Sequence, residues 1–307
     1  MQDFSDRLAV ITGGGTGMGR ALARQLAEQG CSVAMCDISE EDMAESIAIA
    51  EKTATQGVKL TGFRADVADE ARIEAFRDDA LARHESDHVH LLFNNAGIGG
   101  GGSFVAGPRG QWERTFNVCW QGVYNNTRAF LPALMAADEA HIVNTSSVNG
   151  FWASLGPDTP HTAYSAAKFA VKGFTEALVS DLALNAPHVK ASVVMPGHIG
   201  TPIALNSMRE FAGDPENAPL GGEEAQEAIA RAQQFAESGL SAEDAAAIIL
   251  DGVKQERWRI LVGEDAHFID AAVRQSPERA YDRDFWEKEV QPQFATLSET
   301  VTASRKG

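Results

Sequence analysis

The stretch Leu8-Ala-Val-Ile-Thr-Gly-Gly-Gly-Thr-Gly-Met-Gly19 decides the fold, because an apolar strand pattern runs into a glycine-rich turn and then into the helical spacing of residues 20–26. Glycines let the backbone approach a pyrophosphate, and the free N–H groups and dipole of a helix N-terminus favour its negative charge. A tight structural turn is the alternative, but a dinucleotide site requires this strand–turn–helix context. The predicted cofactor contacts in the turn are Gly13, Thr16, Gly17, Met18 and Gly19.

A second buried-strand pattern, residues 31–37, ends in an acid at Asp37. A carboxylate at the end of this strand can accept hydrogen bonds from an adenosine ribose and would repel a 2′-phosphate. No Arg or Lys occupies residues 14–18, so the turn offers no cation to such a phosphate. The pattern favours NAD over NADP as the cofactor.

Tyr164-Ser-Ala-Ala-Lys168 places a phenol and an ammonium one helical turn apart. A phenol titrates at about pH 10, and a neighbouring ammonium stabilises its phenolate and lowers that pKa. Such a pair suits a general acid/base that exchanges a proton with a substrate oxygen. Many exposed helices carry this spacing by chance, so the prediction depends on the nucleotide signature in the same chain. A serine pair, Ser146-Ser147, ends the apolar run upstream.

Strand-like and helix-like segments alternate to about residue 263, with no linker, repeat or low-complexity stretch. The expected strands are residues 8–11, 31–37, 58–63, 89–93, 141–145, 190–195 and 259–262, and the expected helices are 20–26, 40–56, 68–83, 111–135, 164–184 and 242–252. Apolar strands that alternate with helices predict a parallel sheet covered on both faces. We therefore expect one α/β domain over residues 1–263 and a C-terminal extension over residues 264–307.

The 307 residues carry a formal net charge of −17, which disfavours nucleic acid and anionic membranes as partners. Cys31, Cys36 and Cys119 lack the spacing of a metal site and are typical of small apolar core residues in a reducing compartment. We expect no metal. The N-terminus is acidic and polar, and no apolar run could span a bilayer, so the expected location is the cytoplasm.

Short motifs in a fixed order carry a resemblance to a known family. They are Thr12–Gly19, Asp37, Asp66-Val67, Asn94-Asn-Ala-Gly97, Asn117, Ser147, Tyr164, Lys168 and Pro196-Gly-His-Ile-Gly-Thr201. Together they resemble a short-chain dehydrogenase/reductase of the compact single-domain branch, over roughly residues 5–263. The resemblance implies a Rossmann-like, doubly wound sheet of seven parallel strands, and hydride transfer between a nicotinamide and an alcohol or carbonyl. It also implies a homodimer or homotetramer paired through the helices after Gly110 and Tyr164.

Catalytic roles follow from this resemblance. Tyr164 would be the acid/base, and Lys168 would lower its pKa and hold the nicotinamide ribose. Ser147 would polarise the substrate carbonyl, while Ser146 would satisfy backbone groups. Asn117 would hold a water between Lys168 and solvent, unless it is an ordinary helix residue.

Further cofactor contacts are implied in the same way. They are Asp66 and Val67 at the adenine, Asn94, Ala96 and Gly97 at a strand end, and Pro196, Gly197, Ile199 and Thr201 near the nicotinamide. Cofactors of open α/β sheets bind at the carboxyl ends of strands, and Asn94 can also stitch adjacent strands together.

Phe151, Trp152 and His198 are the predicted substrate-lining residues besides Ser147. Residues 202–240 correspond to the family's variable lid over the substrate. Aromatic residues with few convergent cations favour a bulky apolar alcohol or ketone, such as a steroid, a terpenoid or an aryl compound. Core packing is the alternative role of these aromatics. For His198, and for His161 near the site, a structural or substrate-facing role is favoured over proton transfer.

Other functions share this scaffold. An epimerase, a lyase or a dehalogenase is one alternative, although dehalogenase relatives typically lose the glycines and the lysine. A non-catalytic NAD-sensing protein would be expected to lose Tyr164 or Lys168, and both are present. We therefore expect an NAD-dependent oxidoreductase acting on a small secondary alcohol or ketone. The extension is expected to pack on the core or on a neighbouring subunit.

Overall fold

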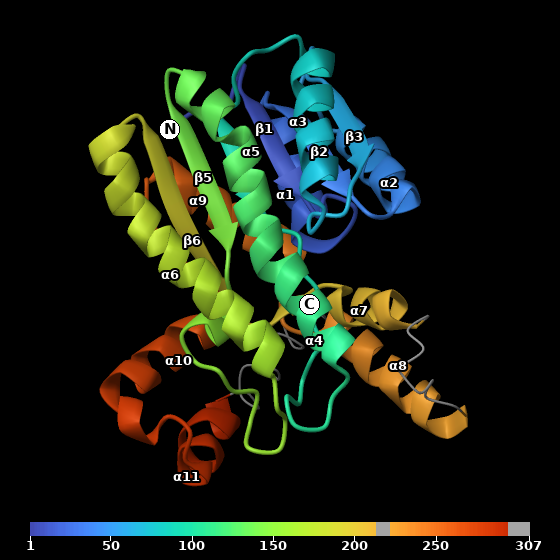
Figure 1. The fold of residues 1–307 in the computed structure, drawn as a ribbon, viewed down its shortest axis with the longest axis vertical. Coiled ribbons are helices and arrows are strands. Elements are labelled where there is room, and N and C mark those ends of the chain that lie inside the picture. Colours follow the sequence, from blue (N-terminus) through green and yellow to red (C-terminus); the bar gives the residue numbers. More distant parts are fainter. Residues whose placement is uncertain (213–221, 294–307) are drawn as a thin grey trace.

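The computed structural model describes residues 1–212 and 222–293, and its centre is a parallel sheet (Figure 1). Seven strands pair in the order β3-β2-β1-β4-β5-β6-β9, and every pair is parallel. Their bounds are β1 Leu8–Thr12, β2 Ser32–Asp37, β3 Leu60–Arg64, β4 Leu91–Asn94, β5 Ala140–Thr145, β6 Val189–Pro196 and β9 Arg259–Val262. The predicted Rossmann-like, doubly wound sheet is confirmed.

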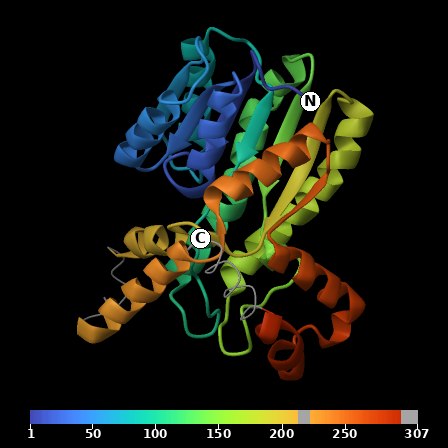
Figure 2. The ribbon, with the colours of Figure 1, turned by 180° about the vertical axis from the view of Figure 1, so that it is seen from behind.

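Helices cover both faces of this sheet, as opposite views show (Figure 1, Figure 2). One face carries α3 Glu70–His84, α5 Gly122–Ala136 and α6 Thr162–Asn185, and the other carries α1 Gly17–Glu28, α2 Glu40–Glu51 and α9 Ala242–Lys254. Each face has its own apolar core, which explains why the strands between them are almost wholly apolar. None of the helices in the described part of the chain is long and apolar enough to cross a membrane.

The order of the strands reverses at β1. The chain runs outward from β1 through β2 to β3 and then returns to pair β4 on the other side of β1. The loops that follow β1 and β4 therefore diverge at the carboxyl edge of the sheet. Ligands of open α/β sheets bind in the crevice that such a reversal leaves.

The long helix expected over residues 111–135 is interrupted. The first segment, α4 Arg109–Phe116, passes into a π-helical turn, Asn117–Gln121, before α5 begins. A π turn inserts one residue into a helix and is frequent at functional sites. Pro132 lies inside α5 near its C-terminal end, and Phe130 and its neighbours pack in the core and hold the helix on the sheet.

Two further parts lie at the carboxyl edge of the sheet (Figure 1). The segment expected to form the lid contains α7 Ile203–Phe211 and α8 Gly222–Glu237, and it is bordered by β7 Ile199–Gly200 and β8 Leu240–Ser241, which pair with each other. The extension contains α10 Glu264–Gln275, a 3₁₀ turn Pro277–Arg279, α11 Arg283–Phe285 and a π turn Trp286–Val290. Residues 213–221 of the expected lid and residues 294–307 of the expected extension lie outside the described residues. The β7–β8 pair was not expected, because two-residue strands leave no periodic pattern.

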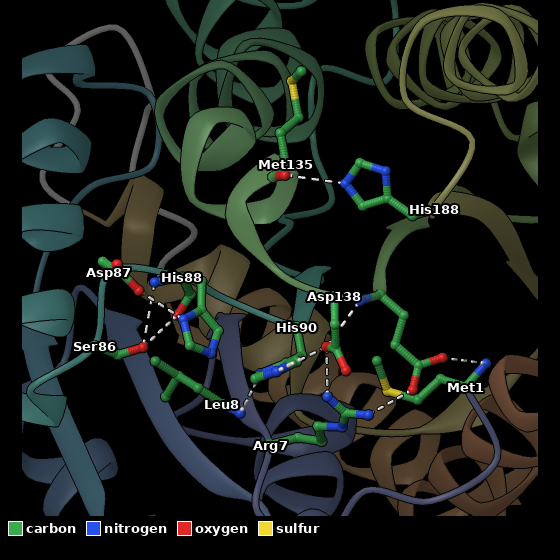
Figure 3. Close-up of polar contacts among 11 residues, drawn as sticks. Met1, Arg7, Leu8, Ser86, Asp87, His88, His90, Met135, Asp138 and His188 are labelled. Atoms are coloured by element: carbon green, nitrogen blue, oxygen red, sulfur yellow. Dashed lines mark hydrogen bonds and ion pairs between the residues drawn. The ribbon is translucent and has the colours of Figure 1, made fainter.

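A polar network holds the opposite edge of the sheet, where the strands begin (Figure 3). Arg7 forms ion pairs with Asp138 and Glu139, both at 2.7 Å. Nδ1 of His90 accepts the backbone N–H of Leu8 at 3.1 Å. An accepting ring nitrogen carries no proton, so this contact requires a neutral imidazole.

Candidate active site

The glycine turn after β1 brings the backbone close to its neighbours. Gly13 has a φ of +65°, and a Cβ built there would lie 2.9 Å from Cα of Ala96. A Cβ on Gly19 would lie only 2.0 Å from the carbonyl oxygen of Gly13. Helix α1 begins at Gly17, and the side chain of its N-cap residue Thr16 makes no capping hydrogen bond. The first N–H groups of α1 are therefore available to an anion, as a dinucleotide site requires.

Asp37 ends β2 beside this turn. Its carboxylate accepts the backbone N–H of Gly15 at 2.9 Å and that of Ser39 at 3.1 Å. The carboxyl lines a cavity of about 410 Å³ over the glycine turn. Burial raises the pKa of Asp37, and the backbone N–H groups act in the opposite direction. Each carboxylate oxygen keeps a second lone pair, so the group can accept hydroxyl donors from the cavity.

Asp66 and Val67 line the same cavity, and the Asp66 carboxylate and the Val67 carbonyl already have partners. One oxygen of Asp66 accepts from Arg114 at 2.7 Å, and the other accepts the N–H of Ala68 at 2.9 Å. The carbonyl of Val67 accepts from Asn125 at 3.0 Å. Each oxygen of Asp66 keeps a second lone pair, so the carboxylate can still accept from a ligand while it holds an ion pair that the sequence did not reveal.

Arg114 is a residue that sequence reasoning missed. It bridges Asp66 to Glu210 on α7, with both contacts at 2.7 Å, and so ties the loop after β3 to α7. An arginine on an amphipathic helix carries no motif, and only the fold brings α4 next to α7.

Asn94 and its neighbours lie where β4 ends. The side-chain amide of Asn94 donates to Thr127 at 2.9 Å and to Asn144 at 2.8 Å, so it stitches β4 to β5 and α5. Ala96 and Gly97 line the cofactor cavity. Asn94 therefore links the two strands, as one alternative predicted. It is not among the residues that line the cofactor cavity.

Tyr164 and Lys168 lie in the first two turns of α6, near the end of β5. Nζ of Lys168 lies 5.4 Å from the centre of the Tyr164 ring and donates to the carbonyl of Thr145 at 2.8 Å. A Cβ built on Gly97 would lie 3.5 Å from the same Nζ, so the ammonium sits just below the cofactor cavity. The spacing of four residues thus brings phenol and ammonium together as expected.

The electrostatics of this pair differ from the expectation. Burial raises the pKa of Tyr164, with a smaller contribution in the same direction from Cys119 and an opposing one from a hydrogen bond with Ser147. Burial lowers the pKa of Lys168. The lowering of the Tyr164 pKa by Lys168 is not seen, because the ammonium is committed to the Thr145 carbonyl and both groups are desolvated.

The serine pair separates into two roles. The hydroxyl of Ser146 donates to the carbonyl of Lys168 at 2.7 Å and so anchors α6 on the end of β5. Ser147 lines a second cavity together with Tyr164, and its oxygen accepts the N–H of Asn149 at 3.1 Å. Its hydroxyl also hydrogen-bonds Tyr164, so the two groups that would contact a substrate oxygen lie side by side.

Asn117 and Cys119 share the π turn but lie in different surroundings. Asn117 is exposed, whereas Cys119 is fully buried. The Cys119 thiol donates to the carbonyl of Ile98 at 3.2 Å, and its sulfur lies 3.6 Å from the position of a Cβ on Gly97. The side chain beside Lys168 is therefore the thiol of Cys119 rather than the amide of Asn117.

The segment after β6 connects both cavities. Gly197 and His198 line the second cavity, and Thr201 lines the first and lies 3.1 Å from the position of a Cβ on Gly17. Pro196 ends β6 and Ile199 begins β7, which places the segment across the carboxyl edge of the sheet.

The second cavity, of about 730 Å³, is lined mainly by apolar side chains and shares Ile203 with the first. Trp152 and His198 line this cavity, as the sequence predicted, although the ring of Trp152 is largely buried. Phe151 instead packs beside the extension, where the Arg259 guanidinium lies 5.9 Å from its ring centre.

The extension supplies part of this cavity, which sequence reasoning did not assign. Asp265, Ile269 and Trp286 line it. Trp286 stacks on Trp152 with ring centres 5.9 Å apart, and the Trp152 indole donates to the carbonyl of Ala280 at 2.7 Å. The aromatic residues in the extension were a signal in the sequence for such a contact. The sequence did not show where in the fold these residues would lie.

A parallel sheet with a glycine turn, an acid at the end of β2 and a buried tyrosine–lysine pair between two adjoining cavities defines a dinucleotide-dependent oxidoreductase. Comparison with known proteins agrees. The family model described as short chain dehydrogenase matches residues 7–210. The chain therefore belongs to the short-chain dehydrogenase/reductase family, whose members act on CH–OH donors with a nicotinamide cofactor.

Relatives match most of the chain. The putative oxidoreductase SadH of Mycobacterium tuberculosis is 36% identical over 277 residues, which cover 89% of this chain and 92% of that protein. Levodione reductase of Leifsonia aquatica is 34% identical over 225 residues, which cover 72% and 79%. The crystal structure of a short-chain dehydrogenase/reductase from Burkholderia phymatum in complex with NAD has a TM-score of 0.78 and 33% identity, covering 91% of this chain and 95% of that one.

Proposed function

We propose that this chain is an NAD-dependent oxidoreductase that interconverts a secondary alcohol and a ketone on a bulky apolar substrate. The observation that supports this most directly is that Tyr164 and Ser147 meet at an apolar cavity adjoining the cofactor cavity. A substrate carbonyl oxygen placed between the Tyr164 phenol and the Ser147 hydroxyl would lie where the second cavity adjoins the cofactor cavity.

The reaction divides between cofactor and side chains. Nicotinamide, when bound, supplies or accepts the hydride at the carbinol carbon. In ketone reduction Tyr164 donates its phenolic proton to the carbonyl oxygen, and in alcohol oxidation it takes the hydroxyl proton. Ser147 donates a hydrogen bond to the same oxygen and stabilises the charge that develops on it. Because burial raises the pKa of Tyr164, the phenol is protonated at neutral pH, the state that reduction needs.

Lys168 has two roles in this proposal. Its ammonium lies below Gly97 at the floor of the cofactor cavity, where it would bind ribose hydroxyls of the nicotinamide half. Burial lowers the pKa of Lys168, so it releases a proton more readily than a surface lysine and can accept or return one as Tyr164 cycles.

The surroundings of Asp37 support NAD over NADP. Its carboxylate is held by Gly15 and Ser39 and faces the cavity together with Asp42. Arg20, the nearest cation on α1, is already paired with Glu45 at 2.6 Å. A 2′-phosphate beside Asp37 would therefore meet the carboxylates of Asp37 and Asp42.

An apolar substrate fits the second cavity. Trp152, Phe211, Ile269 and Trp286 line it, and one relative is named for the reduction of levodione. Desolvating an apolar ketone against these side chains is favourable, whereas a sugar phosphate would find few cations.

The test is a panel of bulky ketones and alcohols, followed through the absorbance of reduced nicotinamide with NAD and NADP in parallel. The expected result is turnover with NAD that disappears in Tyr164→Phe, while that variant still binds the cofactor. Turnover confined to small polar polyols would reject the substrate class. NAD binding without turnover of any compound would favour the NAD-sensing alternative.

A further inference from the structure

His161 stands at the entrance to the acid/base helix. It is the residue just before α6, and its ring centre lies 4.7 Å from that of Tyr164 at a tilt of 32°. Its side chain lines the same cavity as Tyr164 and Ser147. A substrate that reaches Tyr164 therefore passes or contacts this imidazole.

Most other polar groups of the cavity wall are already paired within the protein, although the Gln111 side chain, like His161, has no hydrogen bond or ion pair with the described residues. Asp265 accepts the N–H groups of His198 and Ala266, and the hydroxyl of Ser207 donates to a backbone carbonyl at 2.6 Å. Nε2 of His198 contacts the carbonyl of Phe235 at 3.0 Å. By contrast, the His161 ring has no hydrogen bond or ion pair with any of the residues that the structure describes, only its contact with Tyr164.

The protonation state of this imidazole suits a neutral ligand. Burial alone lowers the pKa of His161 to about 4, with no neighbouring charge contributing. At physiological pH the ring is neutral, with one nitrogen that donates and one that accepts. It can therefore pair with a hydroxyl or a carbonyl, and it offers no ion pair to a carboxylate or phosphate.

We propose that His161 is a specificity-determining residue that hydrogen-bonds a second oxygen of the substrate, a hydroxyl or a carbonyl, while the reacting carbonyl lies at Tyr164 and Ser147. This inference rests on the proposed function and narrows its substrate class to apolar skeletons with two oxygen functions. An analogue without the second oxygen would leave the imidazole desolvated and without a hydrogen-bond partner. The enzyme would therefore bind the transition state of that analogue more weakly than that of the oxygenated substrate.

The test uses the full-length protein and matched pairs of cyclic ketones that share a skeleton, one member carrying a second oxygen at each ring position in turn. We expect the wild type to favour at least one oxygenated member by about 10- to 100-fold in kcat/KM. His161→Phe, which keeps a ring beside Tyr164, should remove that preference and leave the oxygen-free ketone almost unaffected. His161→Gln, which can donate and accept, should restore part of the preference.

Two results would overturn the role of His161 and leave the proposed function in place. One is turnover by the wild type without preference for any oxygenated member. The other is a loss in His161→Phe that is equal for both members of the pair, since packing would then be the role of the ring. If the wild type binds NADH and turns over none of the ketones, the proposed function fails and this inference fails with it. Leu155→Ala, another change in the cavity wall, should affect both members of a pair alike.

Discussion

At the scale of a single residue, the buried thiol of Cys119 is a neighbour that acts on Tyr164. It lies against Gly97 and Ile98 and adds to the factors that raise the pKa of Tyr164, of which burial is the largest. A serine at this position could keep the hydrogen bond to the Ile98 carbonyl. Removing the thiol therefore removes an influence that raises the pKa of the phenol.

We predict that Cys119→Ser moves the basic limb of the pH profile of ketone reduction to lower pH by a fraction of a pH unit. That limb reports loss of the Tyr164 proton, so the measurement is kcat/KM from neutral to alkaline pH. Asn117→Ala should leave the limb in place, because the amide is exposed. A shift in Asn117→Ala with none in Cys119→Ser would restore the relay role that the resemblance implies for Asn117.

At the scale of an element, the first turn of α10 holds the loop that lines both cavities. Asp265 accepts the backbone N–H of His198 at 2.6 Å and that of Ala266 at 2.9 Å. A Cβ on Gly197 would lie 2.1 Å from the same carboxylate, so the loop fits tightly around it. The extension thereby positions the segment that leads to Thr201.

Asp265→Ala should lower the free energy of unfolding by about 1–3 kcal/mol, because two buried N–H groups lose their acceptor. Urea unfolding of the variant and of Glu264→Ala, a neighbouring exposed acid, would measure the difference. We also expect a higher KM for the cofactor in Asp265→Ala, since the loop reaches the cofactor cavity. Equal stability of the two variants would show that α10 does not hold this loop.

Buried histidines set the pH dependence of stability for the whole molecule. Burial is the main cause that lowers the pKa of His84, His90 and His141 to about 4. Between about pH 6.5 and pH 4 the unfolded chain binds protons that the folded chain does not, so stability falls as the pH falls through this range. Asp37 and Asp265, whose pKa values burial raises, act in the opposite direction.

The contribution of His90 can be isolated with His90→Gln. The variant removes one titrating group, so its free energy of unfolding should depend less on pH than that of the wild type, by on the order of 3 kcal/mol between pH 7 and pH 4. Urea unfolding of both proteins at several pH values checks this. Parallel curves would show that the Leu8–His90 contact does not control the titration.

Assembly is the second property at this scale. Tyr124 on α5 and Phe169 on α6 are 39% and 42% exposed. The family resemblance implies that subunits pair through these helices. Both helices cover the same face of the sheet (Figure 1). We propose that this face pairs two copies of the chain.

Phe169→Glu should then reduce the molar mass measured by light scattering towards that of a monomer, because a charge would be buried in an apolar contact. Ala44→Glu, at an exposed residue of α2 on the opposite face of the sheet, should leave the mass unchanged. A wild type that is monomeric at all concentrations would reject the proposed interface.

The sequence by itself determined the features that arise within one short segment. The turn from Leu8 to Gly19, the acid that ends β2 and the Tyr164–Lys168 spacing could be predicted, because a strand or a helix positions its own side chains by period alone. Alternation of such segments was enough to predict the parallel sheet. These properties need no knowledge of which distant parts of the chain meet.

Only the tertiary structure decided what surrounds those groups. The π turn adds one residue, which rotates the following side chains by roughly 100° and helps to bring Cys119 rather than Asn117 beside Lys168. Burial, which the spacing cannot predict, raises the pKa of Tyr164 above that of an exposed phenol. Trp286 reaches the cavity from the last turn described, because contacts between distant segments depend on how elements pack and not on their order in the chain.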